Sequence, residues 1–157
     1  LRQAGPYAGT REEATMRTTI LALLQPIPAE SLPALGDALL AVERGDTALG
    51  VSGLEKVAQG LPDEQGGADV RLYAGRVARA AGRTADAERL FRGADVPAAK
   101  ATAPAAELAL AGLLADLDRP KEAVAVLERM ILGFPDSALI PQARRLLDEV
   151  RGAVPRT

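Results

Sequence analysis

The feature that most constrains the fold of this chain is a pattern that recurs about every 36 residues. Its clearest copy covers residues 107–135: a segment rich in leucine and alanine, a tight corner at 117–120, and a second apolar segment at 121–133. Matching corners occur at Gly45 and Gly82. A period of this size is typical of stacked helical hairpins, because a single hairpin cannot bury its own apolar face.

The composition favours closely packed helices. Hydrophobic residues make up 48% of the 157 residues and charged residues 25%, which is ordinary for a folded protein. Aromatic residues are only 3%, and alanine and leucine supply most of the apolar side chains. The net charge of −2 gives no overall preference for nucleic acid or for an anionic membrane.

Several function classes lack the residues that they need. The chain has neither cysteine nor histidine, which excludes disulfides, thiol nucleophiles, zinc sites with those ligands and imidazole chemistry. No phosphate-binding loop, dinucleotide-binding glycine pattern or nucleophile–base–acid set is present. We therefore expect no enzyme and predict no catalytic, cofactor-binding or metal-binding residue. A hydrolase with two carboxylates stays formally open.

Two kinds of partner are also not expected. The longest apolar run, at 108–115, is far shorter than the roughly 20 residues of a membrane-spanning helix. A sustained basic stripe and stacking aromatic residues are missing, so we do not expect binding to nucleic acid.

Apolar residues recur with helical spacing and nowhere alternate as in a strand, which predicts an all-α chain of about eight helices. The first helix starts at a capping box of Thr10 and Glu13 and ends before Pro26. We expect Gly82 to follow the end of the fourth helix and Thr84 to cap the fifth. The predicted core stripes, in chain order, are Met16, Ile20, Leu23 and Leu24; Leu35, Leu39 and Val42; Leu54, Val57, Ala58 and Leu61; Val70, Tyr73, Ala74, Val77, Ala78 and Ala81; Ala87, Leu90, Phe91 and Ala94; Leu110, Leu113, Leu114 and Leu117; Val124, Leu127, Ile131 and Phe134; and Ala143, Leu146, Leu147 and Val150.

These segments predict one domain. Residues 1–9 lack periodicity and form an N-terminal arm, and residues 10–157 form a single helical-repeat domain. After an N-terminal helix come three hairpins, at about 31–62, 68–97 and 104–135, with an Ala/Pro-rich connector at 95–104. A last amphipathic helix at about 139–151 has no partner helix after it. We expect this helix to cover the apolar flank of the third hairpin.

Residues 31–137 resemble the tetratricopeptide repeat family, whose 34-residue unit needs small residues where its two helices approach closely. The third copy matches best and the first copy least, and the spacing of 36 to 37 residues implies loop insertions. The residues at the matching positions are Ala38, Gly50, Leu54, Val57 and Pro62 in copy one; Gly75, Ala87, Phe91, Ala94 and Pro97 in copy two; and Ala111, Ala123, Met130 and Pro135 in copy three.

The resemblance implies a short right-handed α-solenoid whose first helices line a concave face. On that face it places eight candidate partner-binding residues: Leu35, Leu39, Val42, Leu72, Arg76, Arg79, Leu108 and Gly112. An apolar trough with two arginines suits a protein or peptide segment that carries a carboxylate. The alternative is that Arg76, Arg79 and Arg83 form a solvated face neutralised by nearby acidic residues.

The resemblance therefore predicts a protein-interaction or scaffold module. A second hypothesis is a structural subunit of a larger, possibly membrane-associated complex, held by its termini or its convex face. The segment at 122–149 is similar to bacterial cell-envelope members of the family, which favours a periplasmic or cell-envelope location over a cytoplasmic one.

Overall fold

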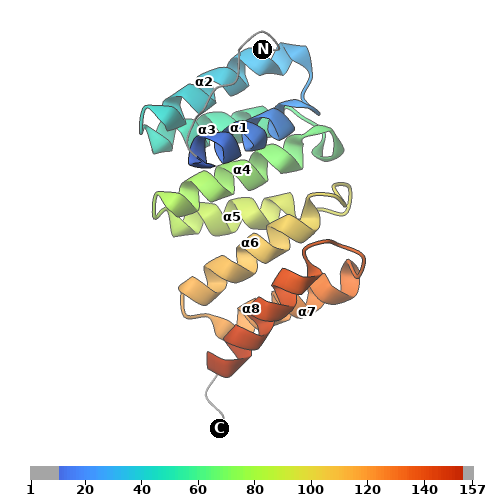
Figure 1. Cartoon of the computed structure of the whole chain (residues 1–157). Helices are drawn as coiled ribbons and strands as arrows, with labels where there is room; N and C mark the ends of the chain where they lie inside the picture. Colours follow the sequence, from blue (N-terminus) through green and yellow to red (C-terminus); the bar gives the residue numbers. More distant parts are fainter. Residues whose placement is uncertain (1–10, 154–157) are drawn as a thin grey trace.

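A computed structural model describes residues 11–153 of the chain, and this part is all-α (Figure 1). It contains eight α-helices, two short 3₁₀ helices at Ala29–Ser31 and Asp63–Gln65, and no strand. The α-helices are α1 (Arg11–Leu24), α2 (Leu32–Glu43), α3 (Thr47–Gln59), α4 (Gly67–Ala80), α5 (Thr84–Ala94), α6 (Ala103–Asp116), α7 (Pro120–Gly133) and α8 (Ile140–Ala153).

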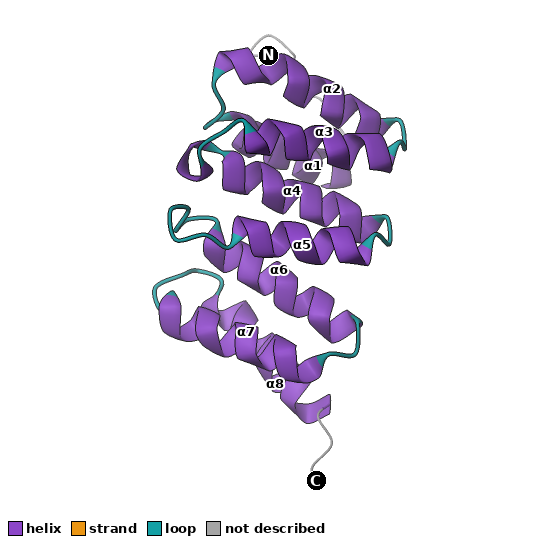
Figure 2. Cartoon of the chain, turned by 180° about the vertical axis from the view of Figure 1, so that it is seen from behind, coloured by secondary structure: helices purple, strands orange, loops and turns teal. Residues whose placement is uncertain are grey.

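Helices that are adjacent in sequence are adjacent in space from α2 to α8. Each packs against the next, so the helices lie one after another along the long axis of the molecule (Figures 1 and 2). The last helix, α8, packs against α7 and reaches α6, as expected for a helix that covers the third hairpin. The first helix, α1, lies across one face of this stack, beside α4 (Figure 1).

Three of the turns have the same geometry. Gly45, Gly82 and Asp118, which are 37 and 36 residues apart, have positive φ angles of 83°, 72° and 56°. In each case the next residue donates its N–H to a carbonyl five residues back, at 2.9 Å for all three. This is the Schellman arrangement, which explains why glycine suits the turn and confirms the predicted position of Gly82.

Small residues stand where the two helices of a hairpin approach most closely. A Cβ atom added to Gly50 would lie 2.5 Å from the Cγ2 of Val42, and one added to Gly75 would lie 2.6 Å from ring carbons of Phe91. Ala111 and Ala123 are both fully buried in the third hairpin. A larger side chain at these positions would force the paired helices apart.

The core differs from the predicted stripes in several helices. In α2, Ala38 and Ala41 are buried while Leu39 and Val42 are only partly buried, and Ala81, which follows α4, is exposed. In α7 the buried residues are Ala123, Val126, Leu127 and Met130, while Val124, Ile131 and Phe134 are only partly buried. The buried face of α7 is rotated relative to the predicted stripe because α7 is packed between α6 and α8. In α1, Met16 is 49% exposed, because this helix lies on the surface of the stack and only one side of it is covered.

The start of α5 differs from the prediction by one residue. The residue before α5 in the cap position is Arg83, and its side chain makes no cap hydrogen bond, so Thr84 is the first helical residue and not the cap. The predicted arm at 1–9 and the capping residue Thr10 lie outside the described residues. The Ala/Pro-rich connector ends at Thr102, whose hydroxyl donates to a carboxylate oxygen of Asp69 at 2.7 Å.

None of the helices in the described range has both the length and the apolar character that a membrane span requires.

Candidate interaction groove

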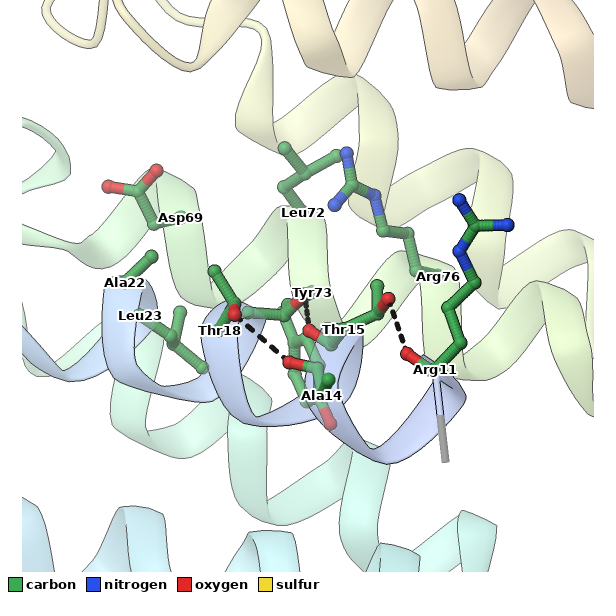
Figure 3. A pocket seen from close by; sticks show the side chains of 11 residues that line it. Arg11, Ala14, Thr15, Thr18, Ala22, Leu23, Asp69, Leu72, Tyr73 and Arg76 are labelled. Atoms are coloured by element: carbon green, nitrogen blue, oxygen red, sulfur yellow. Dashed lines mark hydrogen bonds between the residues drawn. The ribbon is translucent and has the colours of Figure 1, made fainter. Parts of the chain in front are cut away.

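Two cavities of about 580 Å³ each open on the same face of the molecule. The first, the α1/α4 cavity, lies between those two helices (Figure 3). The second, the α4/α6/α8 cavity, is lined by three helices that alternate along the stack. Arg76 on α4 lines both cavities, so the two are neighbours and form one groove.

Four of the eight predicted partner-binding residues come together in the α4/α6/α8 cavity. Arg76 and Arg79 come from α4, and Leu108 and Gly112 come from α6. They meet because the first helices of successive hairpins lie side by side on this face, with the arginines one turn apart on α4. A fifth predicted residue, Leu72, lines the α1/α4 cavity.

The other three predicted residues do not line the groove. Leu35 is fully buried in the core of the first hairpin, where no partner reaches it. Leu39 and Val42 are partly buried and pack against the same core. Within the described range, the α1 end of the groove is instead lined by side chains of α1 together with Asp69, Leu72, Tyr73 and Arg76 of α4.

Residues of α8 also belong to the groove, although the sequence predicted only a covering role for this helix. They are Leu139, just before the helix, and Gln142, Arg145, Leu146 and Glu149. From 142 to 149 their spacing is that of one helical face. That spacing was visible in the sequence, but the direction in which α8 turns this face depends on how it packs against α7.

The charges of the α4/α6/α8 cavity are not balanced. Arg79 forms an ion pair with Asp116 at the end of α6, and its guanidinium lies over Gly112. A Cβ at position 112 would be 3.3 Å from Nη1 of Arg79, so glycine leaves room for the arginine. Arg76 and Arg145 form no ion pair with any residue that the structure describes. Two cations are therefore uncommitted, with Glu149 as the only acidic side chain in the cavity lining.

The α1/α4 cavity contains three threonines, but their hydroxyl protons are already used in hydrogen bonds within α1. The hydroxyls of Thr15, Thr18 and Thr19 each donate to a carbonyl oxygen four residues earlier in α1, all at 2.9 Å. They therefore give no hydrogen bond to α4 across the cavity (Figure 3). Burial, together with the charge of Glu43, raises the pKa of Tyr73 above its usual value, so the phenol stays neutral.

Away from the groove, several arginines are paired with carboxylates of a neighbouring hairpin. Arg89 on α5 pairs with Glu55 on α3, and Arg119 before α7 pairs with Glu88 on α5. Hydrogen bonds, chiefly from Arg119, lower the pKa of Glu88. Hydrogen bonds from Arg89 and then Arg83 lower the pKa of Asp86. The alternative of a neutralised face thus describes Arg83 and Arg79 but not Arg76.

No group of acidic side chains that could hold a metal ion occurs between residues 11 and 153. Glu107 on α6 is nearly completely buried, accepts a hydrogen bond from Arg129 at 2.5 Å, and lines neither cavity of the groove. Comparison of the chain with known protein families, with curated proteins and with solved structures finds no match in any of the three.

Proposed function

We propose that this protein is a short right-handed α-solenoid of the tetratricopeptide type that binds a segment of a partner protein and has no enzymatic activity. The groove formed by α4, α6 and α8 is its binding surface. The partner segment carries carboxylates that pair with Arg76 and Arg145, and apolar side chains that contact Leu108 and Leu146.

The solenoid assignment is supported by repetition inside the chain. The same turn occurs three times at a spacing of 36 to 37 residues. The small residues that the family needs at Gly75, Ala87, Ala111 and Ala123 stand at close helix contacts or in the core. Each hairpin also binds the next through ion pairs such as Glu55–Arg89.

The single observation that carries the binding proposal is the pair of uncommitted arginines. Most arginines of this chain that the structure describes are bound to carboxylates, including Arg71, Arg89, Arg92 and Arg129. Arg76 and Arg145 line a concave, partly apolar surface without such a partner. A cation in a groove that forms no ion pair within the protein is complementary to an acidic ligand.

The test begins with the partner, which is identified by co-purification from the native source and mass spectrometry. Binding of the purified partner is then measured for Arg76→Glu, because this residue lies at the centre of the groove. We expect affinity to fall by at least about tenfold, which is the loss for one charge-assisted contact replaced by repulsion. Arg144→Glu is the matched control, since Arg144 is exposed on α8 next to Arg145 but does not line the cavity.

The second candidate function, a structural subunit held by its termini or its convex face, makes the opposite prediction. In that case Arg76→Glu combined with Arg79→Glu leaves the partner bound, while deletion of residues 1–9 releases it. One observation favours this candidate: Leu132 on α7 is 82% exposed, away from the groove. One observation speaks against this candidate: charged side chains at the contacts between hairpins form ion pairs within the chain and are not left for a partner.

A further inference from the structure

The end of the stack formed by α2 and α3 carries an uncovered apolar surface, separate from the groove. We call it the α2/α3 edge. It encloses a cavity of about 470 Å³ whose floor is made by buried residues, among them Ala38, Ala41 and Val57. Leu49, which also lines it, is 62% exposed.

The same surface occurs two more times in the chain. Counting from the matching turns at Gly45, Gly82 and Asp118 gives the equivalent positions. Ala38, Ala41 and Val57 correspond to Gly75, Ala78 and Ala94 in the second hairpin, and to Ala111, Leu114 and Met130 in the third. These positions are buried in all three hairpins, so they mark the same place in each.

In both later hairpins the preceding helix packs against the first helix of the pair, α3 against α4 and α5 against α6. The helix that comes before the first hairpin, α1, does not take this place, because it lies against Leu72 and Tyr73 of α4 instead (Figure 3). No described helix therefore lies beyond α2 in the stack (Figure 1).

The charges at the edge indicate which helix would fit. Lys56 on α3 corresponds to Arg129 on α7, which binds Asp95 directly after α5 at 2.8 Å. Lys56 itself has no ion pair among the described residues, and the same is true of Glu30 and Asp37 on the α2 side. A complementary helix carries a carboxylate near its C-terminal end, facing Lys56, and a basic side chain facing α2.

The edge is also roomier than its counterparts. Gly53 stands where the later hairpins have Leu90 and Val126, and Ala34 stands where they have Arg71 and Glu107. The missing side-chain volume leaves space for large apolar side chains from the occupant.

We infer that the α2/α3 edge is a second binding surface, which accepts one amphipathic helix of a partner protein in the way that α3 and α5 pack against the following hairpins. The helix presents bulky apolar residues to the cavity and a carboxylate to Lys56. This inference depends on the repeated turns and does not depend on what the groove binds.

The probe for this surface is a synthetic peptide of residues 84–95, which is the sequence of α5 with Asp95. A side-chain staple holds it helical, because an isolated helix of this length is marginal in water. The labelled peptide is titrated against the full chain by fluorescence anisotropy. We expect saturable binding that Ala34→Trp weakens by at least about tenfold by filling the cavity. Ala34 is exposed, so this variant keeps its fold, as circular dichroism checks.

Two controls make the result specific. Ala125→Trp places the same side chain on an exposed position of α7 and should leave binding unchanged. Lys56→Glu should weaken binding about three- to fivefold, and a peptide with Asp95→Lys should recover it with this variant. The inference is wrong if the stapled peptide shows no saturable binding, or if Ala34→Trp binds it equally well. A stable dimer that Ala34→Trp dissociates in sedimentation would assign the edge to a second copy of the chain instead.

Discussion

At the scale of single residues, Gly75 is one of the positions where the packing leaves no room for a side chain. A Cβ there would lie 2.6 Å from both Cδ1 and Cε1 of Phe91, which is itself fully buried. We expect Gly75→Val to lower the free energy of unfolding by about 2–3 kcal/mol, because the ring cannot move without opening the hairpin. Urea denaturation followed by circular dichroism measures this loss.

Gly36 provides the matched control, since it is also a helical glycine, but a Cβ added to it would have no neighbouring atom within 4 Å. Gly36→Ala should raise the free energy of unfolding by up to about 1 kcal/mol through helix propensity. Equal effects of the two substitutions would contradict the close approach of α4 and α5.

The buried carboxyl of Glu107 gives the protein a distinct pH dependence. Burial raises its pKa above the ordinary 4.5, and the hydrogen bond from Arg129 only partly opposes this. The folded chain therefore retains a proton that the unfolded chain releases as pH rises through 4.5. The contribution of Glu107 to the free energy of unfolding therefore decreases as pH rises from 4.5 to the raised pKa.

Glu107→Gln should remove this trend. The stability of the variant relative to the native chain is expected to increase as pH rises from about 4.5 upward, measured by urea denaturation at several pH values. Asp86 and Glu88, whose pKa values are lowered, stabilise the fold above their ordinary pKa and lose this effect as pH falls. They are present in both proteins, so their contribution cancels in the difference. A difference that is flat with pH would contradict the prediction.

At the scale of elements, the three equivalent turns differ in one residue that matters. Asp118 adopts a left-handed conformation, with φ 56°, where the other two copies have glycine. We expect Asp118→Gly to stabilise the chain by about 0.5–1 kcal/mol, and Gly82→Ala to destabilise it by a similar amount. Thermal unfolding of both variants checks the two signs, and a destabilised Asp118→Gly variant would show that the aspartate side chain does more than fill the turn.

The elements also show how far the sequence could predict the structure. The helices and the turn at Gly82 follow from local spacing and glycine chemistry, which the sequence contains directly. The sequence predicted four residues at the centre of the groove, because equivalent positions of neighbouring hairpins could be matched. These residues are Arg76, Arg79, Leu108 and Gly112. Leu35 was predicted both in a core stripe and on the partner-binding face, and it lies in the core. Helical spacing defines an apolar face without saying what covers it. The placement of α1 on α4 depends on tertiary packing alone.

At the scale of the whole molecule, stability should be lowest at α1. Of its side chains that the structure describes, only Leu23 is buried, whereas α6 buries eight residues. Native-state hydrogen exchange should therefore show fast exchange in α1 and the slowest exchange in α4 to α7. Deletion of residues 1–24 should leave the remaining helices folded, as judged by circular dichroism. Loss of all helical signal on this deletion would contradict the weak attachment of α1.

Arg76 has one guanidinium but lines two cavities, one of them roofed by α1. A ligand that draws this side chain into the α4/α6/α8 cavity withdraws it from α1, and the position of α1 in turn affects the ligand. Such coupling is reciprocal: the factor by which the ligand loosens α1 equals the factor by which α1 weakens the ligand. For the partner segment that we propose, the shared arginine would make the mobility of the first helix a readout of what is bound in the adjacent cavity.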